Sequence, residues 1–302
     1  MYLIVGATGS LGGRVAKDLL ARGERVRAVV RAGSPLRGTG RHTTPDELRS
    51  LGAELVEADL RQPETLEPHL EGVTAVAMTA SGTKRMPPDT TQAVDHEGAA
   101  ALARAAERAG ADHLVYLSAR GTGPDAPEFL RNKWLGENAI RESGIGATVV
   151  RPALFMEDWI GFLIGAQLQS GTKVQLVGDA DPVKAFVAEP DVAKLVTALL
   201  VEGPPAEGSR QVDYSAAAAS YGEIIERLAR LSGLPLSVER LGPDQQLTTL
   251  AAPLTEAATG LLNVAAHMGE DTLVAREVSQ RYGIDPVGID DFLRQMLAAA
   301  AA

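Results

Sequence analysis

Short runs of β-branched and other apolar residues alternate with stretches of helical periodicity through the first half of the chain. In the stretches between the runs, apolar residues recur three or four positions apart, as at Leu11, Val15 and Leu19, which is typical of amphipathic helices. Strands alternating with helices predict a parallel sheet with right-handed crossovers and helices on both faces. The expected fold class is therefore α/β, a doubly wound parallel sheet of Rossmann type. Six runs are expected to form its strands: 2–5, 25–30, 53–58, 73–79, 113–118 and 147–151.

The regular alternation of predicted strands and helices ends after Pro152. An aromatic-bearing segment (155–168) follows, and after it fewer strands and more helix are predicted. The periodicity predicts a first domain over 1–155, to whose sheet part of 174–214 returns, and a smaller, mainly helical lobe over 156–302. The elements expected in this second half are strands at 174–177, 185–187 and near 211–214, and helices at about 190–201 and 221–231.

The composition is that of an ordinary globular chain. It has 302 residues, of which 45% are hydrophobic and 23% charged, and its formal net charge is −10. No basic stripe is present, so no nucleic-acid partner is expected. No apolar run approaches the roughly 18 residues of a membrane helix, and the chain begins in a strand without a basic and then apolar leader. We therefore expect a cytoplasmic protein with no membrane partner.

Metal and thiol chemistry are not expected. The sequence contains no cysteine, which excludes disulfides, a thiolate nucleophile and cysteine zinc sites. The histidines lack the short spacings of a metal site, so structural or surface roles are expected for them and no metal is predicted. These five residues are His42, His69, His96, His113 and His267.

The segment GATGSLGG (6–13) follows the first strand directly and leads into a helical pattern. A tight glycine turn between a strand and a helix N-terminus presents backbone N–H groups to an anion such as a pyrophosphate. The spacing is G-x-x-G-x-x-G, a variant of the common dinucleotide fingerprint, and its position at the start of a βαβ series supports a dinucleotide site. The residues expected to contact the cofactor are Gly6, Thr8, Gly9, Ser10, Leu11 and Gly12.

The second strand ends at Arg31, where an NAD-preferring protein usually has an acidic residue. Because a guanidinium complements a 2′-phosphate, Arg31 favours NADPH over NADH, with Arg37 and Arg41 as weaker helpers. The alternative is an exposed charge that closes the strand. After the third strand, Asp59 could accept a hydrogen bond from the adenine amino group while Leu60 packs on the ring. Asp59 could equally be the N-cap of a following helix.

Several further motifs resemble those of one family. Together with the glycine loop, the segments EADL, LVYLSA, NKWLGENAIRESGIGATVVRPALFMED and YGIDPVGIDDFL resemble the NmrA-like branch of the atypical short-chain dehydrogenases/reductases. The resemblance implies that Thr79 and Ala80 border the cofactor ribose and that Pro152 and Phe155 lie against the nicotinamide. It also implies that Lys133 is catalytic and contacts the nicotinamide ribose and the reacting groups, with a solvated surface lysine as the alternative. It also implies one of two activities: quinone or aromatic-ketone reduction, or nucleotide binding by a redox-sensing regulator.

One position departs from the reductase pattern. The spacing Tyr-x-x-x-Lys ends here in Lys133, but its tyrosine position holds Phe129, which has no proton to donate. Losing a general acid typically lowers a rate by about 10²–10⁴-fold. The loss matters less for a substrate whose oxyanion is stabilised by conjugation.

Ser118 matches the family position that bonds the substrate carbonyl, and the alternative is a plain serine at a strand end. Arg120 could orient an anionic oxygen of the substrate or form an ion pair within its loop.

The segment 154–165 concentrates aromatic residues in a chain that is only 4% aromatic. Phe155, Trp159 and Phe162 could line an apolar substrate pocket, although an aromatic stripe at this spacing is more often core. The sequence thus predicts an NADPH-dependent oxidoreductase with a small aromatic or quinone-like substrate, its cofactor on the first domain and its substrate on the second lobe. The alternative is a non-catalytic NADP(H)-binding redox sensor. An epimerase or dehydratase is less favoured because such enzymes normally retain the tyrosine.

Overall fold

The computed structural model describes two compact units. One comprises residues 1–151 and 192–213, and the other residues 152–191 and 214–302. The residues whose structure is described are 1–31, 42–83, 89–168, 171–177, 182–242, 245, 247–250, 264 and 267–301, so the expected loop helpers Arg37 and Arg41 lie outside them.

A seven-stranded sheet forms the centre of the first unit, in the order β10-β6-β5-β4-β1-β2-β3. The registers between β1, β2, β3, β4, β5 and β6 are all parallel, which confirms the expected α/β fold class. All six predicted strands are present, with ends shifted by at most two residues. The strands are β1 (Tyr2–Val5), β2 (Val26–Val30), β3 (Glu54–Glu57), β4 (Ala75–Met78), β5 (His113–Leu117), β6 (Gly146–Pro152) and β10 (Ser209–Tyr214).

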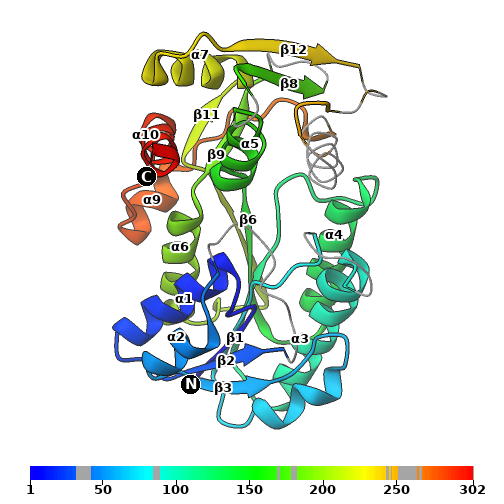
Figure 1. The fold of residues 1–302 in the computed structure, drawn as a ribbon. Helices are drawn as coiled ribbons and strands as arrows, with labels where there is room; N and C mark the ends of the chain where they lie inside the picture. The colour runs from blue at the N-terminus through cyan, green and yellow to red at the C-terminus, as the bar shows by residue number, and fades with distance from the viewer. Residues whose placement is uncertain are drawn as a thin grey trace. The chain divides into compact units, whose positions relative to one another are not determined.

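Helices cover both faces of this sheet. Figure 1 shows α1 (Ser10–Ala21) and α6 (Glu189–Glu202) along one face, and α3 (Ala99–Arg108) and α4 (Glu128–Glu142) along the other. A π-helical segment, η3 (Gln92–Gly98), runs directly into α3 and packs closely on α4. The short helix α2 (Pro45–Ser50) is capped by Thr44, whose hydroxyl accepts from the N–H of Glu47.

The segment after Asp59 forms two short 3₁₀ turns, η1 (Pro63–Thr65) and η2 (Glu67–His69), and no α-helix. Each turn has a proline within its first two positions, Pro63 and Pro68 respectively. Because proline has no N–H to donate, Pro68 interrupts the hydrogen-bond ladder that would join the two turns into one α-helix. The Asp59 carboxylate therefore caps a turn: its Oδ1 accepts from the N–H of Arg61, two residues on.

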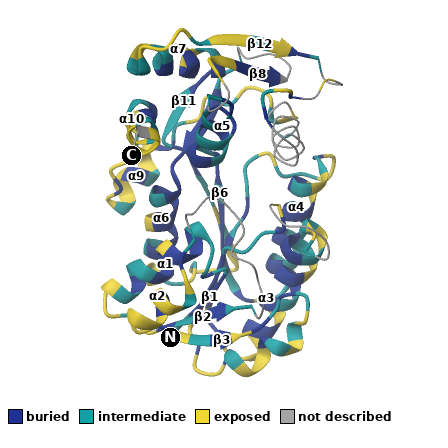
Figure 2. Cartoon of the chain, viewed as in Figure 1, coloured by how far each residue is buried: buried dark blue, intermediate teal, exposed yellow. Residues whose placement is uncertain are grey.

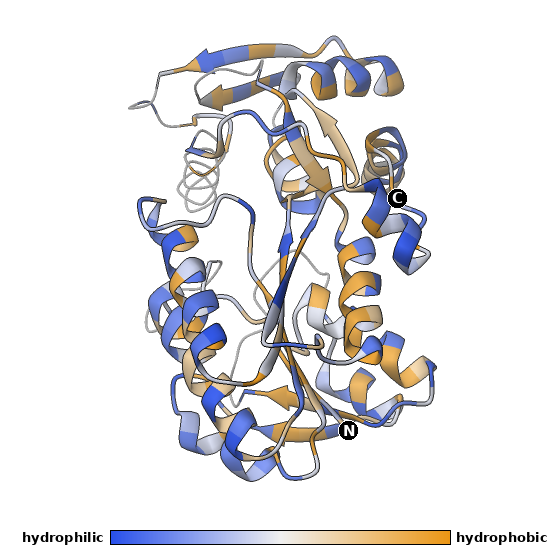
Figure 3. Ribbon diagram, turned by 180° about the vertical axis from the view of Figure 1, so that it is seen from behind, coloured by the Kyte–Doolittle hydropathy of each residue, from blue (hydrophilic) through white to orange (hydrophobic). Residues whose placement is uncertain are grey.

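The sheet of the first unit is buried on both faces, as expected for parallel strands between helix layers. All four residues of β4 are buried, and Leu3, Ile4 and Val5 of β1 are almost fully so. Figure 2 shows these strands as buried and the outer sides of α2 as exposed. Helix α6 is largely hydrophobic, whereas α4 carries many polar residues (Figure 3).

The second unit contains two small sheets and several helices. A three-stranded sheet has the order β11-β9-β7, and β8 pairs with β12 in parallel. The strands expected at 174–177 and 185–187 and the helix expected at 221–231 are confirmed, whereas β7, β11 and β12 were not anticipated. The elements are β7 (Leu154–Phe155), η4 (Glu157–Phe162), α5 (Gly165–Leu168), β8 (Lys173–Val177), β9 (Lys184–Val187), β11 (Ala217–Ala219), α7 (Tyr221–Ser232), β12 (Ser237–Leu241), α9 (Arg276–Tyr282) and α10 (Ile289–Ala301).

Helix α7 shows how its sequence sets its ends. Ser220 and Glu223 form a reciprocal capping box at its start, and Gly233 at φ +71° ends it in the left-handed region.

In the described part of the chain, no helix has both the length and the hydrophobicity that crossing a bilayer requires.

Candidate dinucleotide site

The glycine loop connects β1 to α1 at the carboxyl end of the sheet, where open α/β folds bind their ligands. Gly6 has φ +93°, a conformation that L side chains rarely adopt. A Cβ atom at Gly6 would lie 2.8 Å from the backbone nitrogen of Ala80 and 2.8 Å from Thr79 Oγ1. The first glycine of the motif is therefore required both by its backbone and by the close approach of the β4 end.

Gly12 lies in the first turn of α1 and serves a different purpose. A Cβ atom there would collide with the Gly6 carbonyl oxygen and with Thr79 Oγ1. The Thr79 hydroxyl donates to the carbonyl oxygen of Val5 at 2.9 Å, which fixes it in this position. Thr79, expected to border the cofactor ribose, thus also holds the end of β4 against the glycine loop.

The N-terminus of α1 has no side-chain cap. Gly9 is the N-cap residue, and the first turn carries no acidic side chain. The first N–H groups of an α-helix have no partner within the helix, and here no capping side chain accepts from them. This loop and helix end therefore fit an anionic group such as a pyrophosphate, and the glycines leave room for its approach.

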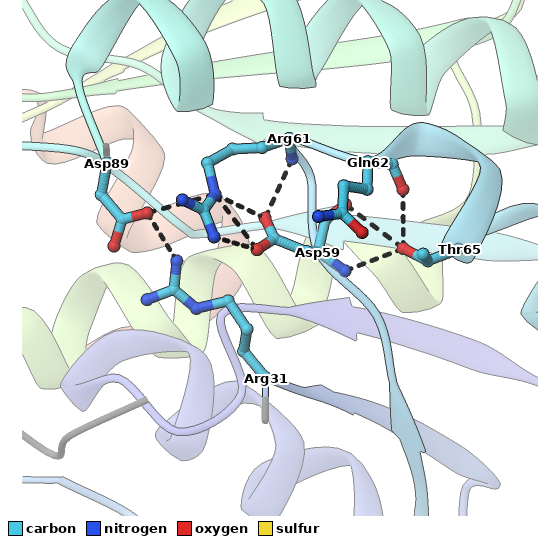
Figure 4. A network of polar contacts seen from close by, with 6 residues as sticks. All are labelled: Arg31, Asp59, Arg61, Gln62, Thr65 and Asp89. Atoms are coloured by element: carbon cyan, nitrogen blue, oxygen red, sulfur yellow. Dashed lines mark hydrogen bonds and ion pairs between the residues drawn. The ribbon is translucent and has the colours of Figure 1, made fainter. Parts of the chain in front are cut away.

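A network of four charged side chains lies beyond the ends of β2 and β3, shown in Figure 4. Arg31 Nη1 lies 2.6 Å from Asp89 Oδ1, and Arg61 Nε lies 3.3 Å from the same oxygen. Arg61 also donates to both carboxylate oxygens of Asp59. The four side chains are between 12% and 27% exposed, so solvent reaches them. Arg31 is therefore part of a network and not an isolated charge closing the strand.

The expected adenine contacts, Asp59 and Leu60, have protein partners. Burial alone would raise the pKa of Asp59, but the hydrogen bonds and charge of Arg61, together with the charge of Arg31, lower it overall. The backbone N–H of Asp59 donates to Thr65 Oγ1 at 2.9 Å. Leu60 is 7% exposed and packs in the hydrophobic core of this unit.

Lys133 lies on α4 and is almost fully buried, with 3% of its side chain exposed. Its ammonium nitrogen lies 2.8 Å from Asp95 Oδ1 and donates to the carbonyl oxygen of Leu117 at 2.6 Å. It also lies 5.0 Å from the ring centroid of Tyr116. A buried lysine must be compensated in this way because desolvating an isolated ammonium is very unfavourable. Lys133 therefore joins α4 to η3 and to the end of β5.

Asp95 connects that pair to the segment after β4. Its Oδ2 accepts from the backbone N–H of Gly82 at 2.8 Å and from Ser81 Oγ at 3.2 Å. Its carbonyl oxygen accepts from the Tyr116 hydroxyl at 2.8 Å. Burial, followed by the charges of Asp95 and Glu137, raises the pKa of Tyr116 well above its ordinary value of 10.0. Tyr116 is thus a buried structural tyrosine, and it does not replace the missing tyrosine at Phe129.

A second buried carboxylate, Glu137, accepts a hydrogen bond from the hydroxyl of Ser118. Arg151 donates to Glu137 through Nε at 2.8 Å and through Nη2, and Arg141 donates at 3.1 Å. Burial acts to raise the pKa of Glu137, yet the bonds from Arg151 and Ser118 lower it overall. In this structure the one hydrogen of the Ser118 hydroxyl is used within the protein, so Ser118 would have to rotate to donate to a substrate.

The remaining predicted residues fall into two groups. Phe129 lies in the first turn of α4, four residues before Lys133, and is partly exposed; Arg120 is partly buried and has interaction partners. In the second unit, Trp159 is 7% exposed within the hydrophobic core, and Phe155 and Phe162 are partly buried against it. Pro152 is buried in the same unit.

Four residues that the sequence analysis did not single out organise these sites: Arg61, Asp89, Asp95 and Glu137. Arg61 could have been noticed because it follows the EADL motif at a strand end. Glu137 lies within the family-like segment 132–158, but its partners do not follow from that segment. Asp89 and Asp95 gave no signal, because a carboxylate on a helix or in a loop shows its partner only after folding.

Comparison with known proteins shows the family of this chain. The sequence profile of the NmrA-like family matches residues 2–293. The (4-alkanoyl-5-oxo-2,5-dihydrofuran-3-yl)methyl phosphate reductase of Streptomyces griseus is 34% identical over 263 residues, which are 85% of this chain and 84% of that protein. Photosystem II assembly factor Ycf39 of Synechocystis is 29% identical over 248 residues, covering 79% of this chain and 72% of that protein.

The fold is shared with a solved structure. The NADPH-dependent quinone oxidoreductase of Escherichia coli, solved with NADPH, has a TM-score of 0.78 at 19% identity, covering 98% of this chain and 100% of that one. At this identity the likeness concerns the fold alone. The resemblance indicated by the motifs is confirmed over nearly the whole length, and the chain belongs to the NmrA-like family.

Proposed function

We propose that this protein is an NADPH-dependent reductase that transfers a hydride to a conjugated or polycyclic aromatic ketone or a quinone. The observation that carries the proposal is the loop between β1 and α1, where the glycines leave space beside a helix N-terminus that has no side-chain cap. The Streptomyces relative is named a reductase, and a protein of the same fold is an NADPH-dependent quinone oxidoreductase, which supports reduction as the reaction.

The residues of the first unit fit the parts of NADPH. The backbone of 6–12 would hold the pyrophosphate, and Thr79 and Ala80 lie beside this loop, where a ribose would follow. Arg31 would bind the 2′-phosphate, since a guanidinium bonds phosphate oxygens in pairs. When bound, NADPH supplies the hydride. We assign cofactor binding to 1–155 and substrate binding to 156–302. The partly buried Phe155 and Phe162 would contribute apolar surface, and Trp159 would support them from the core.

This site is distinguished by the source of the proton that the reduced substrate must take up. Phe129 has no donor, the ammonium of Lys133 is held by Asp95 and Leu117, and Tyr116 is buried with a raised pKa. None of these three residues offers a proton to a substrate in this arrangement. We therefore infer a substrate that delocalises the negative charge left by hydride addition and takes its proton from water. The name of the Streptomyces relative describes such a conjugated oxo compound.

The test is consumption of NADPH by the purified protein with a panel of quinones and polycyclic aromatic ketones, run in parallel with NADH. We expect turnover with NADPH on at least one member. The variant Arg31→Glu should lose the preference for NADPH while keeping NADH turnover. Arg49→Glu, an exposed arginine on α2, serves as a charge-matched control. An unchanged cofactor preference in Arg31→Glu would remove Arg31 from the 2′-phosphate site.

A second candidate function is a nucleotide-binding regulator without turnover. It is favoured by the sequestration of Lys133 and Ser118 in buried contacts, which leaves the expected catalytic groups engaged. Tight, redox-selective binding of NADP(H) with no consumption across the substrate panel would establish this function in place of the reductase.

A further inference from the structure

The network in Figure 4 brings two guanidinium groups to a single anionic oxygen. Arg31 approaches Asp89 Oδ1 from the end of β2 and Arg61 approaches it from beyond the end of β3, at 2.6 Å and 3.3 Å. Neighbouring parallel strands end at the same edge of the sheet, so these two arginines face the same volume of solvent. Two guanidiniums converging on one oxygen is an arrangement that also suits a phosphomonoester.

Arg61 is held in place before any ligand arrives. Its Nε donates to Asp59 Oδ1 and Oδ2 at 3.0 and 3.1 Å, and Asp59 in turn accepts from the Arg61 backbone N–H at 2.9 Å. A guanidinium fixed by a carboxylate loses little conformational freedom when it binds a phosphate. Asp59 thus positions Arg61 beside Arg31.

Among the residues that the structure describes, the charges of this network cancel. Arg31 and Arg61 contribute two positive charges, and Asp59 and Asp89 contribute two negative charges. A dianionic phosphate gains little from a neutral cluster, and it would meet repulsion from the Asp89 carboxylate at the point where both arginines converge. For a phosphate to bind there, the carboxylate of Asp89 must give up its two arginine contacts.

We propose that Arg61 is the second guanidinium of the 2′-phosphate site and that Asp89 is a built-in competitor for that site. This inference rests on the proposed NADPH function and concerns the selectivity of the same site. Asp89 occupies the arginines when no phosphate is present, and a 2′-phosphate replaces it. NADH has a hydroxyl group at this position, so its binding leaves the Asp89 contacts intact. Asp89 therefore lowers the affinity for NADPH without lowering the affinity for NADH.

The experiment measures binding of two fragments by calorimetry, 2′,5′-ADP and 5′-AMP, which differ only in the 2′-phosphate. Asp89→Asn should tighten 2′,5′-ADP about 3- to 10-fold and leave 5′-AMP unchanged, because one repulsive charge is removed. Asp46→Asn, which removes an equal charge from an exposed pair on α2, is the matched control and should change neither affinity. The gain in Asp89→Asn should shrink at high salt.

Arg61 is tested in the same assay. Arg61→Gln should weaken 2′,5′-ADP about 10-fold more than it weakens 5′-AMP, and Arg61→Lys, which keeps the charge but not the planar fork, should give a smaller loss. Thermal unfolding confirms that each variant is folded, and Arg61→Lys carries the test if Arg61→Gln is not.

Three results would overturn the inference. If Asp89→Asn weakens 2′,5′-ADP or leaves it unchanged, Asp89 supports the arginines and does not compete. If the Arg61 variants weaken both fragments equally, Arg61 acts only through Asp59. If the unmodified protein binds neither fragment nor NADPH, the proposed function itself fails, and this outcome is distinct from the first two, in which binding persists.

Discussion

Two groups of ion pairs in the first unit differ in their surroundings although they use the same kinds of side chain. The pairs Lys133–Asp95 and Arg151–Glu137 lie around α4, where both carboxylates are fully buried. Lys133 is 3% exposed, and Arg151, at 19%, is the member of these two pairs that reaches solvent. The network beyond the ends of β2 and β3, shown in Figure 4, is open to solvent, since each of its four side chains is between 12% and 27% exposed.

The difference in burial separates two roles. A buried pair joins the elements that carry its two partners. Removing one partner strongly destabilises the fold, because the other charge is left uncompensated and away from water. A partly exposed pair contributes little to stability, but its charges can be recruited by a ligand. The pairs around α4 are therefore expected to stabilise the fold, and the network at the ends of β2 and β3 to set ligand selectivity.

The largest effect is expected from Asp95→Ala. This change leaves the ammonium of Lys133 buried without its carboxylate and removes the acceptor for the N–H of Gly82. We expect a loss of about 3–5 kcal/mol in the free energy of unfolding, measured by urea denaturation. The double variant Asp95→Ala/Lys133→Met should recover part of the loss because it removes the orphaned charge. A single variant as stable as the unmodified protein would contradict the structural role of this pair.

Glu137→Gln should come next, because it removes the charge but keeps the shape of a buried side chain. We expect a loss of about 1.5–3 kcal/mol at neutral pH, as for hydrogen bonds to a charged group. The pKa of Glu137 is lowered from its ordinary value of 4.5 in the folded protein. Its contribution to stability is therefore complete above that ordinary value and is lost as the pH falls through the folded pKa. Urea unfolding between neutral and acidic pH should show the two proteins converging as the pH falls; a constant difference would count against this assignment.

The same contrast explains what could be predicted from the sequence. The strands, the glycine loop and Arg31 are local features: apolar runs, a strand-to-helix glycine turn and a strand end are visible in consecutive residues. The partners Asp95 and Glu137 come from tertiary packing, because each meets a side chain that is distant in sequence. Strand β11 is Ala217–Ala219, and alanine has little preference for strands, so its pairing with β9 rather than its own sequence makes it a strand.

Ser118→Ala should have a smaller effect on stability. Ser118 donates to Glu137, but the two arginines remain as partners of that carboxylate. We expect a loss of about 1 kcal/mol in the free energy of unfolding. If Ser118 also bonds the substrate carbonyl, kcat/KM will fall by much more than the change in stability accounts for. Steady-state kinetics alongside urea unfolding separates the two roles, and Thr122→Ala, which removes a longer contact to Glu137, is the control.

The smallest effect on stability is expected from Asp89→Asn. Asp89 is 12% exposed and forms ion pairs with Arg31 and Arg61, which are 22% and 27% exposed, so solvent can replace the lost contacts. We expect a change below about 1 kcal/mol in the free energy of unfolding, measured in the same urea experiment as Asp95→Ala. A loss as large as that of Asp95→Ala would show that the network holds the ends of β2 and β3 together. The two groups of ion pairs would then share one structural role, despite their difference in exposure.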